Sequence, residues 1–348
     1  DFLTGVWSAI DTSGVTSDVF WKLIADASGN ILVAGEFVDI GGSGVNKFAV
    51  WNGTAFSQLG GANPNGTVYD IVLDSVGNIY IAGAFTAIGG SGFGGLAKWD
   101  LTLGAWVNIG DVSGGTAKIR AIIFSSTGQL IIGGNFTHVN AIAAKNIAIS
   151  NMFGSIVPGP SWQALGAGTD NTVFALGWIN TLSSVHVCGA QTLYVGGFFT
   201  LAGATVTTGI ASYTFATSVW ARVGAVNSDS TYGVKGTGPS VNNILIDGSG
   251  RVYVVGNFVE IGGKITSCIA VLEGGATWSD VNGGIGTTFS EGQIIVPGRG
   301  TDMIVGAYMG ASGGWGGAAG FRQPFAILRG GKFIPVPASF SNVSAGQG

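Results

Sequence analysis

Short runs of apolar residues alternate with polar, Gly-rich segments along the whole chain, and helix signals are almost absent. Residues 68–109 are representative. They contain four runs rich in β-branched and aromatic residues, which are Val68–Leu73, Asn78–Phe85, Leu96–Trp99 and Ala105–Ile109. Asp74-Ser75-Val76-Gly77 separates the first two runs and has the composition of a tight turn. The pattern therefore predicts four short strands in this stretch.

Three residue series show that this quartet of strands is repeated. The first is Gly-x-Phe or Gly-x-Tyr, at intervals of 48 to 63 residues, beginning at Gly35, Gly83, Gly134, Gly197, Gly256 and Gly306. The second is an aromatic residue that often opens the phrase Trp-x-x-Leu-Gly, namely Trp7, Phe56, Trp106, Trp162, Trp220, Trp278 and Phe333. The third series is an Ala that stands two residues before a position usually occupied by a large side chain. Its members are Ala49, Ala97, Ala148, Ala211, Ala270 and Ala326. Three series in phase predict a repeat architecture.

Four strands in each of six repeats predict an all-β fold, a β-propeller of six four-stranded blades. The expected repeats lie near residues 11–60, 61–110, 111–166, 167–224, 225–282 and 283–337 of one domain that covers residues 1–348, with a tail at 338–348. The aromatic series has seven members against six Gly-x-Phe units. Either the N-terminal strand around Trp7 joins the blade completed near Phe333 and closes the ring, or that strand caps the ring or belongs to another module, and seven blades remain the alternative.

The motifs also resemble known repeat families. Asp74-Ser75-Val76-Gly77-Asn78-Ile79-Tyr80-Ile81-Ala82-Gly83 is similar to the core of SBBP-type bacterial β-propeller repeats. The longer pattern resembles the kelch-like propellers of fungal cortical polarity markers and of bacterial and phage surface proteins. This resemblance covers about residues 7–336 and implies surface display or secretion more than any reaction. Two repeats depart from it, with Ala190-Gln191-Thr192 and Pro297-Gly298-Arg299-Gly300 in place of the Asp-x-x-Gly turn.

Composition narrows the possible partners. Only 9% of residues are charged, 46% are hydrophobic and the net charge is −4. There is no basic cluster to bind a phosphate backbone, so we expect no nucleic-acid partner. No run approaches 18 uninterrupted apolar residues, so we expect no membrane insertion. A surface so poor in charge suits burial in contacts with other proteins.

The N-terminus and the cysteines add little. The chain begins at Asp1 without a basic and apolar leader, so we expect that a leader has been removed or that this is part of a longer product. Cys188 and Cys268 are too few for a disulfide scaffold, and we interpret both as buried thiols.

Candidate catalytic or metal-binding residues are few. Asp39, His138 and Glu260 occupy matching places in alternate repeats, but we expect them to lie too far apart to share a metal ion. The Asp-x-x-Gly turns supply one carboxylate each, whereas calcium needs six to eight oxygens. Gly89–Gly95 lacks the lysine of a phosphate-binding loop. We therefore predict no catalytic residues, no metal site and no cofactor.

Three tryptophans lie outside the repeat pattern. Trp21, Trp178 and Trp315 have no counterpart in most other repeats, so blade packing does not require them. Trp315 stands in a Gly-rich insertion, where a large aromatic side chain suits contact with a sugar ring or a partner protein. These three residues are the predicted binding residues.

The sequence favours a non-enzymatic structural module, exposed on a virion, an extracellular filament or a cell surface, or secreted. Its expected partners are other structural proteins or copies of itself. The alternatives are a glycan-binding lectin or host-attachment protein, which would bind surface glycans, and a polysaccharide-active enzyme.

Overall fold

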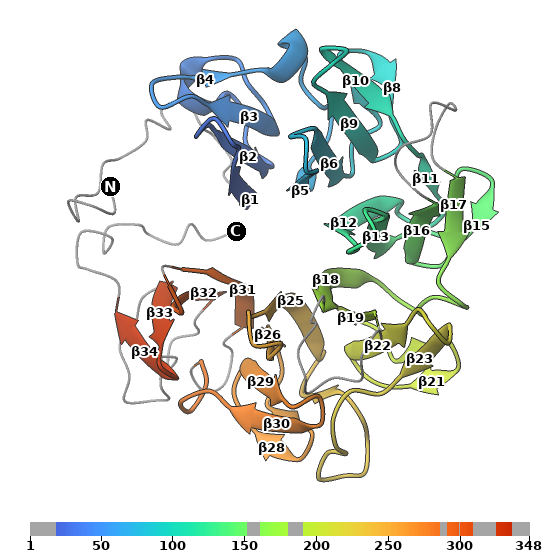
Figure 1. Ribbon diagram of the computed structural model, residues 1–348, viewed down its shortest axis with the longest axis vertical. Helices are drawn as coiled ribbons and strands as arrows, with labels where there is room; N and C mark the ends of the chain where they lie inside the picture. The colour runs from blue at the N-terminus through green and yellow to red at the C-terminus, as the bar shows by residue number, and fades with distance from the viewer. Residues whose placement is uncertain are drawn as a thin grey trace. The chain divides into compact units, whose positions relative to one another are not determined.

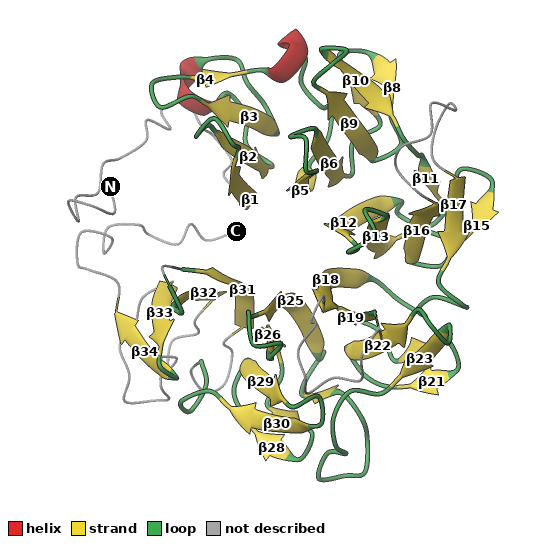
Figure 2. Cartoon of the chain, in the orientation of Figure 1, coloured by secondary structure: helices red, strands yellow, loops and turns green. Residues whose placement is uncertain are grey.

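The computed structural model describes residues 19–151, 161–179, 191–285, 291–298, 300–308 and 325–335. These residues form β-strands, two short 3-10 segments, η1 (Ile40–Gly42) and η2 (Leu59–Gly61), and no α-helix (Figure 2). The prediction of an all-β fold is therefore confirmed. The chain divides into two compact units, Asp1–Leu165 and Gly166–Gly348, called unit 1 and unit 2 below.

Unit 1 contains three four-stranded antiparallel sheets, each with its strands in chain order (Figure 1). They are β1 (Phe20–Ala25), β2 (Ile31–Gly35), β3 (Phe48–Trp51) and β4 (Phe56–Ser57); β5 (Val68–Leu73), β6 (Ile79–Gly83), β9 (Leu96–Asp100) and β10 (Ala105–Asn108); and β12 (Lys118–Phe124), β13 (Leu130–Asn135), β16 (Ile147–Asn151) and β17 (Ser161–Ala164). Smaller sheets pair β7 (Ala87–Ile88) with β8 (Ser91–Gly92), and β14 (His138–Val139) with β11 (Val112–Ser113) and β15 (Ile142–Ala143).

Unit 2 is built in the same way. Its four-stranded sheets are β18 (Val173–Ile179), β19 (Thr192–Gly197), β22 (Ile210–Thr214) and β23 (Val219–Ala221); β25 (Ser240–Ile246), β26 (Val252–Asn257), β29 (Ile269–Glu273) and β30 (Thr277–Asp280); and β31 (Glu291–Pro297), β32 (Met303–Tyr308), β33 (Phe325–Arg329) and β34 (Lys332–Pro335). The smaller sheets contain β20 (Leu201–Ala202) and β21 (Thr205–Val206), and β24 (Val234–Lys235), β27 (Glu260–Ile261) and β28 (Lys264–Ile265).

Each of these six sheets lies within one of the predicted repeats. In the representative repeat, the four predicted strands are present and their ends differ from the prediction by two residues or fewer. The Gly-rich bend of that repeat contains the ribbon of β7 and β8, which the sequence pattern did not indicate. The single domain, the number of blades and the closure of a ring remain predictions, and Trp7 lies outside the described residues.

Close backbone approach explains the Gly-x-Phe series. A β-carbon at Gly83 would lie only 2.0 Å from the carbonyl oxygen of Thr67, which precedes β5. The same clash, at 2.1 or 2.2 Å, would arise at Gly35, Gly134, Gly197 and Gly256. The phenylalanine that follows each of these glycines is at most 2% exposed, as seen for Phe37, Phe85, Phe136, Phe199 and Phe258. The sixth repeat differs, because its Tyr308 is 62% exposed.

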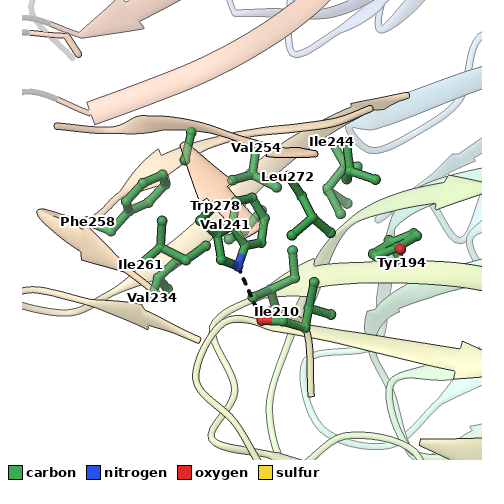
Figure 3. Close-up of a cluster of buried hydrophobic side chains, with 14 of the residues drawn as sticks. Tyr194, Ile210, Val234, Val241, Ile244, Val254, Phe258, Ile261, Leu272 and Trp278 are labelled. Atoms are coloured by element: carbon green, nitrogen blue, oxygen red, sulfur yellow. Dashed lines mark hydrogen bonds between the residues drawn. The ribbon is translucent and has the colours of Figure 1, made fainter. Parts of the chain in front are cut away.

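A hydrogen bond between neighbouring sheets explains the aromatic series. The indole Nε1 of Trp162 donates to the carbonyl of Ile109, at the end of the preceding sheet, over 3.0 Å. Trp278 donates in the same way to Val223 over 3.2 Å, as the dashed line in Figure 3 shows. The glycine after each acceptor leaves room for the indole, because a β-carbon at Gly224 would lie 2.3 Å from Nε1 of Trp278. The motif therefore encodes both halves of a contact that is made between consecutive repeats.

Apolar side chains fill the space between neighbouring sheets of each unit. The cluster in Figure 3 combines residues of two consecutive sheets in unit 2, including Tyr194, Ile210, Val254 and Trp278. The alanines of the third series are fully buried in the third strand of their sheets, at positions 49, 97, 148, 211, 270 and 326. Cys268 is 3% exposed, and burial raises the pKa of its thiol to about 11. Its prediction as a buried thiol is confirmed, whereas Cys188 lies outside the described residues.

Gly224→Ala tests the contact between sheets. Gly224 has φ +73° and its new β-carbon would overlap the Trp278 indole, so we expect the free energy of unfolding to fall by about 3 kcal/mol. Gly274→Ala is the matched control, because Gly274 has φ +58° but no atom within 4 Å of the new β-carbon. There the expected loss is about 1 kcal/mol. Guanidinium denaturation followed by circular dichroism measures both, and equal losses would contradict the role of the indole.

Candidate functional site

A β-bulge occurs at the same place in the first strand of every four-stranded sheet. In β5, for example, Val68 pairs with Gly83 and Asp70 with Ala82, so that Tyr69 is left out of the ladder. The bulged residues of the six sheets are Trp21, Tyr69 and Arg120 in unit 1, and Phe174, Asn242 and Gln293 in unit 2. A bulge redirects the side chain of the extra residue, and bulges often lie next to functional sites. The bulged residues are therefore candidate functional positions.

The three bulged residues of unit 1 form one cluster. Their strands β1, β5 and β12 pack against one another in that order. The rings of Trp21 and Tyr69 meet edge to face, with centroids 5.5 Å apart at 71°. Cζ of Arg120 lies 4.0 Å from the centroid of the Tyr69 ring and 5.7 Å from that of Trp21. Tyr69 and Arg120 are half-buried and Trp21 is 38% exposed, so an indole faces solvent beside a stacked guanidinium.

A buried carboxylate holds the three strands together beneath this cluster. Asp70 accepts a hydrogen bond from the backbone N–H of Ile122 in β12 over 2.9 Å, and its other oxygen lies 3.0 Å from Nζ of Lys22 in β1. In unit 2 Asn243 accepts from the N–H of Ile295 over 3.4 Å at the matching position. The link between first strands is therefore part of the repeat, and the Lys22 ion pair is particular to unit 1 among the described residues.

The cluster carries more positive than negative charge. Lys118 lies two residues before Arg120 in β12, and its pKa is lowered by burial and by the charge of Arg120. Within the described part of the chain, neither Lys118 nor Arg120 forms an ion pair, and Nε of Arg120 is buried without a hydrogen-bond partner. Lys22, Lys118 and Arg120 thus supply three positive charges on β1 and β12, and the carboxylate that links these strands, Asp70, already pairs with Lys22. The surplus cations are suited to an anionic group.

The other predicted binding residues are placed differently. Trp178 lies at the far end of β18, is half-buried, and packs on Phe215 with centroids 5.1 Å apart. Phe215 in turn contacts Tyr213, which packs on Trp220, so that Trp178 extends an aromatic row within its own sheet. Trp315 lies outside the described residues. Of the three predicted binding residues, Trp21 is the one found beside a second aromatic ring and a cation.

Among the acidic and histidine candidates, His138 and Glu260 lie in small sheets and the aspartates of the Asp-x-x-Gly turns have structural roles. His138 is exposed in β14, and Glu260 accepts hydrogen bonds from the backbone and hydroxyl of Ser228 in unit 2. Among the described residues, no group of three His, Cys, Asp or Glu side chains could hold a metal ion. Asp26, Asp74 and Asp247 each accept two backbone N–H bonds within their own turns, as the turn interpretation predicts.

Unit 2 has a small surface cavity of about 160 Å³ beside the exposed ring of Phe198. Its carboxylate, Asp170, accepts hydrogen bonds from the backbone of Thr200 and Leu201 and from the Thr200 hydroxyl. Although burial opposes the effect, these hydrogen bonds lower the pKa of Asp170. Asn65 accepts the matching backbone bonds in unit 1, so this acceptor is a recurring loop device rather than a special feature of the cavity.

Comparison with known proteins agrees with this architecture. The family model described as a β-propeller repeat, SBBP, matches residues 56–84, which contain the Asp74 turn and the Gly83-Ala84 phrase. The extracellular domain of a proposed one component system from B. thetaiotaomicron is similar in structure, with a TM-score of 0.55 and 11% identity over 91% of this chain. The matched repeat and this structural likeness support a β-propeller repeat fold for the chain.

Two further solved structures share the fold with this propeller. One is the extracellular domain of a proposed hybrid two component system from B. thetaiotaomicron, with a TM-score of 0.52 and 14% identity over 91% of this chain. The other is virginiamycin B lyase from Staphylococcus aureus, with a TM-score of 0.50, 10% identity, and coverage of 91% of this chain and 84% of the lyase. The propeller spans 32% and 36% of the two B. thetaiotaomicron chains. At these identities the likeness concerns the fold.

No curated protein sequence matches the propeller. In the described residues, no helix has the length and hydropathy of a membrane span.

Sequence reasoning missed two of the three cluster residues, Tyr69 and Arg120. Each stands one residue after an apolar residue near the start of the first strand, as Trp21 does after Phe20. Aligning the repeats on the turn between their first two strands, which is Asp-x-x-Gly in the first two repeats and Ser125-Ser126-Thr127-Gly128 in the third, would have placed all three in one column. Such an alignment does not show the β-bulge, which removes these three residues from the hydrogen-bonded ladder.

Asp70→Ala tests the link beneath the cluster. It leaves the N–H of Ile122 and the ammonium of Lys22 without their carboxylate, so we expect the free energy of unfolding to fall by about 2–3 kcal/mol. Asp70→Asn keeps an acceptor for Ile122, as Asn243 does in unit 2, and should cost about 1 kcal/mol. Urea denaturation compares them, and equal losses would show that the backbone hydrogen bond contributes little.

Proposed function

We propose that this propeller is a non-enzymatic protein-interaction module, exposed on a cell surface, an extracellular filament or a virion, or secreted. It packs against copies of itself or against other structural proteins.

The exposed apolar side chains carry this proposal. Val206 and Ile265 occupy matching positions in ribbons β21 and β28 of unit 2, where they are 59% and 86% exposed. In unit 1, Val76 and Leu103 in turns are 72% and 68% exposed. When a partner covers such water-exposed aliphatic groups, association is favoured by about 25 cal/mol for each Å² of apolar surface that is buried. With 9% charged residues, little surface charge opposes such association.

The acidic residues support the non-enzymatic part of the proposal. Most of those described accept hydrogen bonds from other groups of the chain, namely Asp26, Asp39, Asp70, Asp74, Asp100, Asp111, Asp170, Asp229, Asp247, Glu260, Asp280, Glu291 and Asp302. Carboxylates used in this way shape turns and loops. They are not arranged as an acid and base around one cavity, which a hydrolase would need.

The similar domain from B. thetaiotaomicron is an extracellular domain, which supports a surface location for this protein. The lyase shows that the fold can also carry an enzyme, and a polysaccharide-active enzyme is the weaker of the two alternatives. No arrangement of the described residues favours it.

The association test uses light scattering during size-exclusion chromatography of the full chain over a range of concentrations. We expect the mean mass to rise with concentration. The double variant Val206→Asp, Ile265→Asp should raise the concentration needed for association about tenfold, because it replaces two exposed apolar groups by charges. Thr217→Asp, Ser249→Asp is the control, which adds the same charge at exposed turn positions. A monomer at all concentrations would refute the proposal, and equal shifts in both variants would assign the effect to net charge alone.

Glycan recognition is the second candidate function. One observation favours it, namely the exposed indole of Trp21 braced edge to face by Tyr69. Sugar rings present a C–H face that stacks on such an aromatic surface.

A glycan array tests this candidate with the full chain and two variants. Trp21→Ala should lower the binding signal about tenfold, since it removes the stacking surface. Tyr308→Ala, which removes a 62% exposed ring in unit 2, should leave it unchanged. Binding that survives Trp21→Ala would remove the proposed contact.

A further inference from the structure

The cluster of Trp21, Tyr69 and Arg120, taken with the nearby Lys118 of β12, has a chemistry more specific than a sugar-stacking surface. Its aromatic part is uncharged and partly open to solvent, whereas its basic part consists of two cations on one strand. The guanidinium of Arg120 is fixed by its position 4.0 Å over the Tyr69 ring. Because one face of the guanidinium is covered and Nε is buried, the N–H groups of its two terminal nitrogens are the part left to bind a ligand.

These N–H groups lack an acceptor within the described part of the chain. No hydrogen bond from Arg120 to a described residue is found, and its Nε is buried. The nearest strand-linking carboxylate, Asp70, is already bonded to Lys22, to the N–H of Ile122 and to its neighbour Ile71. A half-buried arginine without a counter-ion favours an anionic ligand, because the ligand regains both the charge compensation and the hydrogen bonds.

The shape of the cluster selects among anions. A planar guanidinium matches a carboxylate through two parallel hydrogen bonds. Cζ of Arg120 lies 5.7 Å from the centroid of the Trp21 ring, so a ligand that spans both must carry its anionic group directly on a ring-sized body with an apolar face. A hexose that bears a carboxylate on its ring has this form. A free carboxylate would leave the indole unused, and a neutral sugar would leave the guanidinium unpaired.

We propose that Arg120 and Lys118 bind the carboxylate of a uronate sugar whose ring stacks on Trp21. Tyr69 is a positioning residue, which orients the guanidinium and the indole. The inference rests on the glycan-binding candidate and is independent of the association proposal.

Calorimetric titration of the full chain with a galacturonate trimer tests the inference. The comparison ligands are the methyl ester of this trimer, a neutral galactose trimer and a sulfated galactose trimer. We expect the free acid to bind about tenfold more tightly than the ester and the neutral trimer, because only the acid pairs with the two cations. Raising the salt concentration should weaken binding of the acid, since the site is partly open to water.

Variants locate the site. Arg120→Gln should lower the affinity for the acid more than tenfold, and Arg120→Lys about tenfold, since it keeps the charge but not the two parallel hydrogen bonds. Arg222→Gln is the matched control, because Cζ of Arg222 lies 4.1 Å over Tyr232 in unit 2. Circular dichroism checks that each variant folds. If Arg120→Gln does not fold, Lys118→Gln replaces it, with an expected loss about threefold to tenfold.

The outcomes separate this inference from the glycan candidate. Equal affinity for acid and ester, unchanged affinity in Arg120→Gln, or tighter binding of the sulfated trimer would each overturn the uronate assignment. Binding of neutral glycans alone would retain the glycan candidate and overturn the anionic site. If no sugar on the glycan array binds the full chain, both the glycan candidate and the uronate assignment are overturned.

Discussion

The indole–glycine contact between consecutive sheets is the interaction on which the rest of the structure depends. A tryptophan in the fourth strand of one sheet donates its Nε1–H to a carbonyl at the end of the preceding sheet, as Trp162 does to Ile109 and Trp278 to Val223. The donor would otherwise be buried without a partner, at a cost of about 1–3 kcal/mol. The following glycine makes the approach possible, so within each unit a repeat with this tryptophan carries a donor for the sheet before it. A repeat by itself could not satisfy either group, and this couples the stability of neighbouring sheets.

The β-bulge is the feature that makes chemistry possible on such a regular framework. It removes one residue of each first strand from the ladder, and that residue no longer has to match its neighbours in packing. The glycine opposite, such as Gly83, approaches the carbonyl just before the strand so closely that it cannot vary. The bulged residue itself can vary, and it is aromatic at Trp21, Tyr69 and Phe174 but polar at Arg120, Asn242 and Gln293. Function can therefore change at these positions while the fold is retained, as expected for a fold that carries many activities.

The low content of charged residues bears on both the protein surface and the cluster of Trp21, Tyr69 and Arg120. Most described carboxylates close turns or join loops, and the tightest of these arrangements recur from repeat to repeat. On a surface with so few ionised groups, two cations without a described counter-ion are a local exception. Their position next to an exposed indole combines the two kinds of contact, stacking and charge pairing, that acidic sugars offer. The exposed aliphatic groups of unit 2, in contrast, provide only apolar contact area. Such area suits protein partners and gives little selectivity among them.

Sequence alone was sufficient for the class of fold, the repeats and the strands, because each is dictated by local properties. Alternating apolar residues make strands, Asp-x-x-Gly makes turns, and a glycine recurs wherever the backbone of another strand comes too close for a side chain. Trp21 was also found from sequence, since it departs from the repeat. Tyr69 and Arg120 were not, because they lie 48 and 99 positions further along the chain and look like ordinary strand residues. Only the tertiary structure could bring them together, since their proximity depends on the packing of β1, β5 and β12 and on bulges that turn all three side chains out of their ladders.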